Sequence, residues 1–185
     1  MTTSLAICSA ALLMIGADDI SSFEENSREA KLCANLYHVT RDELLQLYPW
    51  RFAVGQMLLP QLTDNPLFGF RYAYQLPADM LRLLGTDNDL PFRIFENRLF
   101  SDASVVRVTY LFKVAEARLP AYFVRAIELK MAEILAIALQ EDLAKSRLMA
   151  EKADKQLIRA RAIDAQQQTT AQLPEHNFLL SNVRN

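Results

Sequence analysis

The stretch 121–139 constrains the fold more than any other part of the sequence. Pro120 precedes it and suits the start of a helix, where its missing N–H is not needed. Only four positions in the stretch are charged, and these are Arg125, Glu128, Lys130 and Glu133. A helix that is apolar almost all round must be buried. We therefore predict a central helix, covered by the rest of the chain or by neighbouring subunits. The four charges argue against a membrane span.

The composition limits the classes of function. The chain has 185 residues, of which 51% are hydrophobic, enough for one ordinary domain with a real core. Twenty Lys and Arg stand against 22 Asp and Glu, a formal charge of −2 that favours neither nucleic acid nor acidic lipid as the partner. The two cysteines, Cys8 and Cys33, form no C-x-x-C unit. We expect both thiols to be reduced and buried.

The N-terminal residues have the spacing of a helix. Apolar side chains recur every three or four positions at Leu5, Cys8, Leu12 and Ile15, and Gly16 stands where a C-terminal cap would be. The first basic residue is Arg28, so the stretch lacks the charged start of a secretion signal. We predict a helix that remains part of the folded protein.

A second helix is predicted from the run 26–29. In that run Asn26 and Glu29 have the spacing of a capping box. Helical spacing then continues to Tyr48, and Pro49 ends it. A break near Thr40 is the alternative, but one long helix is preferred.

The middle of the chain changes to the period of strands. Alternation predicts strands at 72–76 and 106–114, and residues 91–100 are typical of a short hairpin with 96–98 at its tip. Residues 53–62 are a short apolar run that fits a helix or a strand equally well. We expect a small antiparallel sheet.

The last third returns to helix and ends in a tail. Residues 143–167 carry many charges around a thin apolar stripe, which we place at Leu143, Leu148, Leu157, Ile158 and Ala162. A polar linker follows, and then a tail too short to fold alone. The tail contains the large apolar residues Leu173, Phe178, Leu179, Leu180 and Val183. Because exposing them in water is costly, we expect something to cover them.

These patterns predict a mainly α protein. Its fold class would be an antiparallel helix bundle with a small antiparallel β-sheet or hairpin insertion and an extended C-terminal arm. The predicted division is a helical domain at 1–168, with the β-element at about 50–114, and a docking arm at 169–185.

Candidates for catalysis or metal binding are few. His38 lies five positions after Cys33, roughly 140° away around a helix, which makes a poor nucleophile–base pair. Asp87 and Asp89 resemble the opening of a calcium loop, but the later glycine and glutamate are missing. His176 lies in the tail. With four glycines and no phosphate-binding motif, the sequence predicts no catalytic residue, no cofactor and no metal.

Aromatic residues stand among basic ones in two places, 48–52 and 70–74. Such clusters can stack on nucleic-acid bases, although they more often belong to a core.

Several motifs occur together in a recognisable order. They are the link 15–23 between the first two helices, Pro49-Trp50-Arg51-Phe52-Ala53, Tyr74-Gln75-Leu76-Pro77-Ala78-Asp79, and Leu119-Pro120 before a long helix pair. With this set the chain resembles, over about residues 5–168, the tail tubular protein A family. These are the head-to-tail adaptor, or connector, proteins of tailed bacteriophages.

The resemblance implies a structural protein of the virion without enzyme activity or cofactor. Copies of the chain would form a homo-oligomeric ring of twelve at the head–tail junction, between the portal protein and the downstream tail or nozzle protein. Phage DNA would pass through the ring without sequence-specific binding, no membrane would be involved, and the chain would occupy the host cytoplasm before assembly. We expect portal docking through Arg159 and Arg161 of the last helix and through the arm residues Leu173, Phe178, Leu179, Leu180 and Val183.

Two rival functions stay open. One is a small enzyme with a cleft near Trp50 and Asp79. The other is a nucleic-acid-binding module, which the near-balanced charge disfavours.

Overall fold

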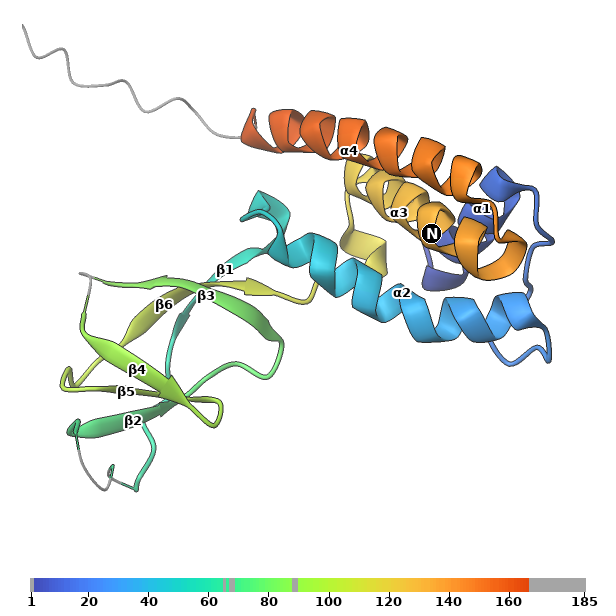
Figure 1. The fold of residues 1–185 in the computed structure, drawn as a ribbon. Helices are drawn as coiled ribbons and strands as arrows, with labels where there is room; N and C mark the ends of the chain where they lie inside the picture. The colour runs from blue at the N-terminus through green and yellow to red at the C-terminus, as the bar shows by residue number, and fades with distance from the viewer. Residues whose placement is uncertain (1, 65, 67–68, 88–89, 167–185) are drawn as a thin grey trace, which may run out of the picture.

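A computed structural model describes residues 2–64, 66, 69–87 and 90–166. Over these ranges the helices gather in one part of the molecule and the strands in another (Figure 1). The helices are α1 (Ser4–Ile15), α2 (Arg28–Gln46), α3 (Ala121–Gln140) and α4 (Leu143–Ala165). The chain leaves the helices after α2 and returns through the short 3-10 helix η3 (Glu116–Arg118) to α3.

The strands form two sheets. One has the order β1–β6–β3, from β1 (Val54–Leu58), β6 (Arg107–Phe112) and β3 (Met80–Thr86). The other has the order β2–β5–β4, from β2 (Tyr72–Gln75), β5 (Arg98–Ser101) and β4 (Phe92–Phe95). Every pairing is antiparallel.

The predicted mainly α class is therefore wrong. Across the described ranges, four α-helices accompany two three-stranded antiparallel sheets, which is a mixed α/β architecture. Two strands account for the difference. β1 settles the first part of the ambiguous run 53–62 as strand, because the backbone of 54–58 pairs with β6. β3 was not predicted, since its pairing with β6 shifts register twice and the sequence loses its alternation there.

Side-chain caps explain most of the helix starts. Thr3 Oγ1 accepts the N–H of Ala6 at 3.1 Å before α1, and Gly16, with φ of 74°, ends that helix. α2 is one unbroken helix, as predicted, but its cap is Ser27, whose hydroxyl accepts the N–H of Ala30 at 3.2 Å. Asn26, one residue earlier, instead accepts from the ammonium of Lys31.

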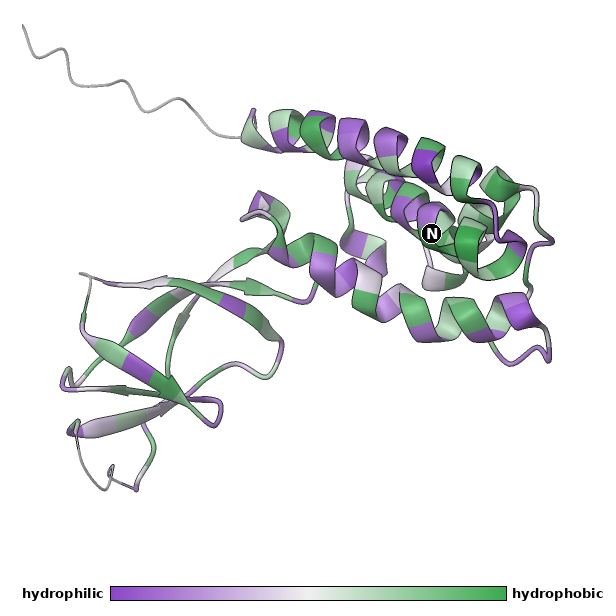
Figure 2. Cartoon of the chain, viewed as in Figure 1, coloured by the Kyte–Doolittle hydropathy of each residue, from purple (hydrophilic) through white to green (hydrophobic). Residues whose placement is uncertain are grey.

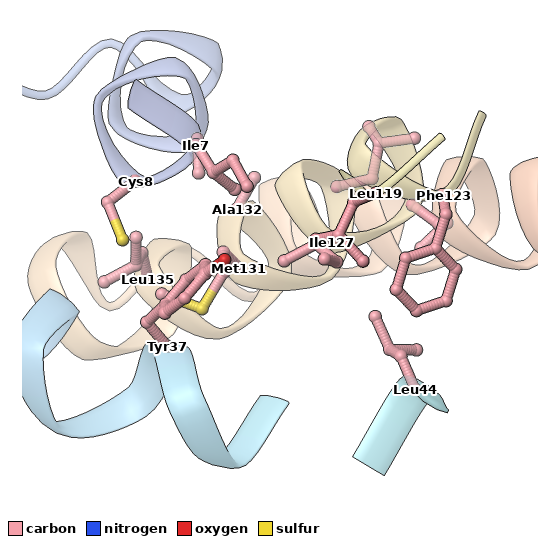
Figure 3. Close-up of a cluster of buried hydrophobic side chains, with 14 of the residues drawn as sticks. Ile7, Cys8, Tyr37, Leu44, Leu119, Phe123, Ile127, Met131, Ala132 and Leu135 are labelled. Atoms are coloured by element: carbon pink, nitrogen blue, oxygen red, sulfur yellow. The ribbon is translucent and has the colours of Figure 1, made fainter. Parts of the chain in front are cut away.

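The prediction of a buried central helix is confirmed for α3. Its apolar side chains are buried among α1, α2 and α4 of the same chain. Figure 3 shows Ile7 and Cys8 of α1 and Tyr37 and Leu44 of α2 meeting this helix. Seven of its residues have 0% exposure: Phe123, Ala126, Ile127, Met131, Ala132, Leu135 and Ala136. No helix in the part of the chain that the structure describes is long and apolar enough to span a membrane.

The apolar stripe predicted on α4 is displaced from the real one. Leu143, Leu148 and Ile158 are exposed, the last of them by 67%. Of the predicted stripe, Leu157 is on the buried face, which otherwise contains Met149 and the small or polar residues Ser146, Ala153, Ala160 and Asp164. Hydrophobic and hydrophilic residues accordingly alternate along α4 in Figure 2. Small side chains let α4 lie close to α3, which is the helix it contacts most.

A second, smaller core lies between the two sheets. Tyr74 and Leu99 enter it from one sheet and Val108 and Tyr110 from the other. The hydroxyl of Tyr74 donates to the carbonyl of Ala103, so its polar end is satisfied. The sheets thus have an apolar interior of their own.

Candidate docking surfaces and the joint that positions them

The run Pro49 to Ala53, one of the two most specific parts of the family resemblance, forms the joint between helices and sheets. Trp50 is fully buried, and its indole N–H donates to the carbonyl of Leu44 at 2.9 Å. Its ring packs edge-on against Tyr48 and Phe123, with centroids 5.1 Å away in both cases. The 3-10 helix η1 (Arg51–Ala53) then leads directly into β1. The aromatic run is therefore structural core, as the prediction favoured.

A buried carboxylate ties this joint to the end of α4. Asp164 is 0% exposed, and its Oδ2 accepts the backbone N–H of Arg51 at 3.0 Å. Its Oδ1 accepts the hydroxyl of Tyr122 at 2.9 Å. Burial, together with the hydrogen bond to Asp164, raises the pKa of Tyr122, so the phenol stays protonated and remains a donor. One side chain thus connects α4, α3 and η1.

Sequence reasoning missed Asp164. A signal was present, because Ala153, Leu157, Ala160 and Asp164 follow each other at the spacing of one helix face. A carboxylate on an otherwise apolar face has to meet hydrogen-bond donors inside the protein. Its donors, however, come from residues more than 40 positions away, which the spacing does not reveal.

The two arginines predicted to contact the portal differ in position. Arg159 is exposed on α4. Arg161 lies over the ring of Tyr48, with its guanidinium carbon 5.6 Å from the ring centroid. Its Nε is buried and has no hydrogen-bond partner within the described ranges. Arg159 is thus available to a partner, whereas Arg161 is part of the joint.

The predicted arm contacts Leu173, Phe178, Leu179, Leu180 and Val183 lie outside the described residues, as does His176. They remain predictions. The helix that precedes them ends beside the joint, where Asp164 holds it (Figure 1).

Ion pairs hold α2 to the segment between β6 and α3. Arg41 donates to Glu116 at 2.6 Å and to Asp42 at 2.8 Å, and it is only 8% exposed. Lys113 reaches the other oxygen of Asp42 at 3.1 Å. Both points where the chain crosses between helices and sheets are therefore anchored to the helices.

Several large apolar side chains face outward from the helices. The most exposed are Ile158 at 67%, Leu13 at 63%, Val39 at 57% and Leu47 at 55%. The first three belong to α4, α1 and α2, and Leu47 is the residue that caps the end of α2. Exposed groups of this size are common at surfaces that other proteins cover, although single ones need no partner.

An open groove of about 410 Å³ lies on one face of the sheet β2–β5–β4. Its lining is Asp64, Pro66, Gly69, Phe70, Ala73, Arg93, Phe95, Glu96, Arg98 and Phe100. Sequence reasoning did not predict it, because its floor depends on which residues of three strands share a face.

The residues weighed for catalysis are not brought together. His38 is exposed and stacks edge-on against Tyr37 at 5.3 Å. Asp79 is exposed on the sheet side, whereas Trp50 is buried in the joint, so these two do not share a cleft. Asp87 pairs with Arg107 at 3.1 Å. Among residues placed by the structure, no three potential ligands form a metal site.

Cys8 and Cys33 are both buried and free, as expected. Contact with Cys33 and burial raise the pKa of Cys8, which keeps that thiol neutral.

The sequence matches no protein-family model, and no curated protein matches it.

Proposed function

We propose that the chain is a structural head-to-tail adaptor of a tailed bacteriophage. Copies would form a ring, twelve-membered as in the family it resembles, that joins the portal to the tail and continues the DNA channel. The proposal combines the resemblance over about residues 5–168 with the arrangement of the joint. It includes no catalytic step.

The observation that carries the proposal is the hydrogen bond of Asp164 to Arg51. One of the two most specific motifs of the resemblance, at 49–53, is thereby joined to the end of the long helix α4. A protein that links two partners has to fix the directions in which its contact surfaces point. The buried contact of Asp164 with Arg51 and Tyr122 supplies such rigidity, because separating it would leave a carboxylate and two donors unpaired.

The surface chemistry is consistent with subunit contacts. Exposed apolar residues occur on α1, α2 and α4, so more than one side of the bundle offers area to a neighbour. A ring needs two different faces on each copy, because its contacts are head-to-tail. The near-balanced net charge of −2 also suits a channel wall, since a strongly basic lumen would retain the DNA phosphates.

Portal docking is assigned to Arg159 and to the apolar arm residues. The test is co-sedimentation of the chain with purified rings of its cognate portal protein. We expect the wild type to sediment with the portal and the full-length variant Phe178→Ser/Leu179→Ser/Leu180→Ser to remain in the supernatant.

A matched control changes the arm without removing its apolar groups. The variant Thr169→Ser/Thr170→Ser should bind the portal like the wild type. Equal far-ultraviolet circular dichroism would show that all three proteins are folded. Undiminished sedimentation of the triple variant would contradict the role of the arm, and absence of wild-type binding would contradict the adaptor function.

A further inference from the structure

The groove on the sheet β2–β5–β4 is built by one set of alternating side chains. Arg93 and Phe95 of β4 and Phe100 of β5 line it. Leu99 points to the opposite face and is fully buried in the smaller core. Because side chains alternate along a strand, Ile94 also belongs to that opposite face.

The groove combines an apolar floor with charges at its border. The rings of Phe95 and Phe100 lie 6.0 Å apart, and Phe95 is 57% exposed. Arg93 and Arg98 contribute positive charge, whereas Asp64 and Glu96 contribute negative charge. A volume of about 410 Å³ with this lining is typical of sites that bind an apolar group within a polar frame.

We propose that this groove binds the C-terminal segment of the same chain, residues 173–184. In an extended segment Phe178 and Leu180 point to the same side, so both can enter the groove while Leu179 points away. The segment also carries Glu175 and Arg184, one charge of each sign. These match the mixed charges at the border of the groove.

The length of the chain allows this contact. Arg51 touches Asp164, and the N–H of Leu62 donates to the carbonyl of Ala73 in the groove. The backbone from Arg51 to Leu62 spans at most about 40 Å, and the two contacts add roughly 5 Å each. Because α4 ends at Ala165, the extended part begins at Gln166, and its length to Leu180 is at most about 50 Å. The segment can therefore reach the groove of its own copy.

Tethering favours the same copy over a neighbour. A connection whose average length matches the span gives a tethered group an effective concentration on the order of millimolar, and a connection near full extension gives a lower one. A second copy at micromolar concentration would compete poorly. The contact would keep Phe178 and Leu180 out of water in the free chain.

This inference does not depend on the adaptor function. If both hold, the portal takes the segment from the groove during docking. The experiment is done on the free chain without portal, so its outcome is separate from that of the co-sedimentation test.

The test is paramagnetic relaxation in the full-length, ¹⁵N-labelled chain. A nitroxide is attached through Ser181→Cys, and because Cys8 and Cys33 are buried, the new thiol is the one that reacts. We expect the amide resonances of Arg93, Phe95 and Phe100 to lose most of their intensity.

Paired variants decide whether the groove causes the effect. In the labelled chain, Phe95→Ser should abolish the loss of intensity, whereas Ile94→Ser, its neighbour on the opposite face, should preserve it. Likewise Phe178→Ser/Leu180→Ser should abolish it and Leu179→Ser should not. The proposal would be overturned if the nitroxide-labelled chain without further substitutions lost no intensity. It would also be overturned if the two variants of either pair changed the intensity equally.

A mixing experiment identifies the copy that binds. Chain at natural isotope abundance that carries the nitroxide is mixed with ¹⁵N-labelled chain that carries none. Undiminished intensity in the mixture supports binding within one chain. Loss of intensity in the mixture would overturn it in favour of a neighbouring copy.

Discussion

Asp164, near the end of α4, accepts the backbone N–H of Arg51 at 3.0 Å across 113 positions of sequence. The same carboxylate accepts the hydroxyl of Tyr122 and has no exposure to solvent. Removing a buried acceptor leaves each donor with the cost of desolvation and no bond in return. This contact should therefore contribute strongly to the stability of the joint.

We predict that Asp164→Ala lowers the free energy of unfolding by about 3 kcal/mol, since two buried donors lose their partner. The exposed residue Asp154 on the same helix provides the control, and Asp154→Ala should change stability by no more than about 0.5 kcal/mol. Urea unfolding followed by circular dichroism measures both. Equal stability of the two variants would show that the joint does not depend on Asp164.

Two buried tyrosines should respond differently to the loss of the hydroxyl. Tyr122→Phe removes a hydrogen bond to a carboxylate and should cost about 2 kcal/mol. The hydroxyl of Tyr37 is buried with no hydrogen-bond partner within the described ranges, so Tyr37→Phe should be neutral or stabilising. The difference in urea midpoint between these variants is the measurement. A greater loss for Tyr37→Phe would refute this assignment.

The same tyrosines predict a loss of stability at alkaline pH. Burial raises the pKa of Tyr37 and of Tyr122 above the ordinary value near 10. A raised folded-state pKa means that the stabilisation is complete below about pH 10 and declines as the pH rises further. Urea midpoints between pH 8 and 11 should fall less steeply for Tyr37→Phe/Tyr122→Phe than for the wild type. Parallel curves would contradict the prediction.

Local sequence patterns predicted the elements whose determinants are close together in the chain. The hairpin at 91–100 was predicted from its turn residues, and β4 and β5 are joined through Glu96 and Asn97, both with positive φ. The central position of α3 followed from its composition alone. Both were confirmed because the deciding interactions lie within one element or one turn.

Elements set by distant partners were not predictable in this way. β3 keeps no clear alternation, and its pairing with β6 contains two irregularities. The stripe on α4 was misplaced because Ala153 and Ala160 are buried by close contact with α3, while the larger Ile158 is exposed. The side-chain sizes that fit at a contact between two helices depend on both helices. The sequence of one helix alone therefore does not specify which of its residues are buried. The groove depends in the same way on the register of three strands.

Two substitutions of glutamate by glycine, one at the end of α3 and one inside α4, should change stability in opposite directions. Glu141 caps α3 with φ of 53°, a conformation that favours glycine. Glu141→Gly should stabilise the protein by about 1 kcal/mol. Glu151→Gly, at an exposed position inside α4, should destabilise it by about 1 kcal/mol. Thermal unfolding of both variants is the measurement, and a loss of stability for Glu141→Gly would contradict the role of the cap.

Electron microscopy of cognate portal rings mixed with the purified full-length chain tests the adaptor function most directly. The adaptor account predicts an additional ring of density on the tail-facing side of the portal, with its channel continuous with that of the portal. Portal rings that stay unchanged at saturating concentrations of folded chain would contradict it.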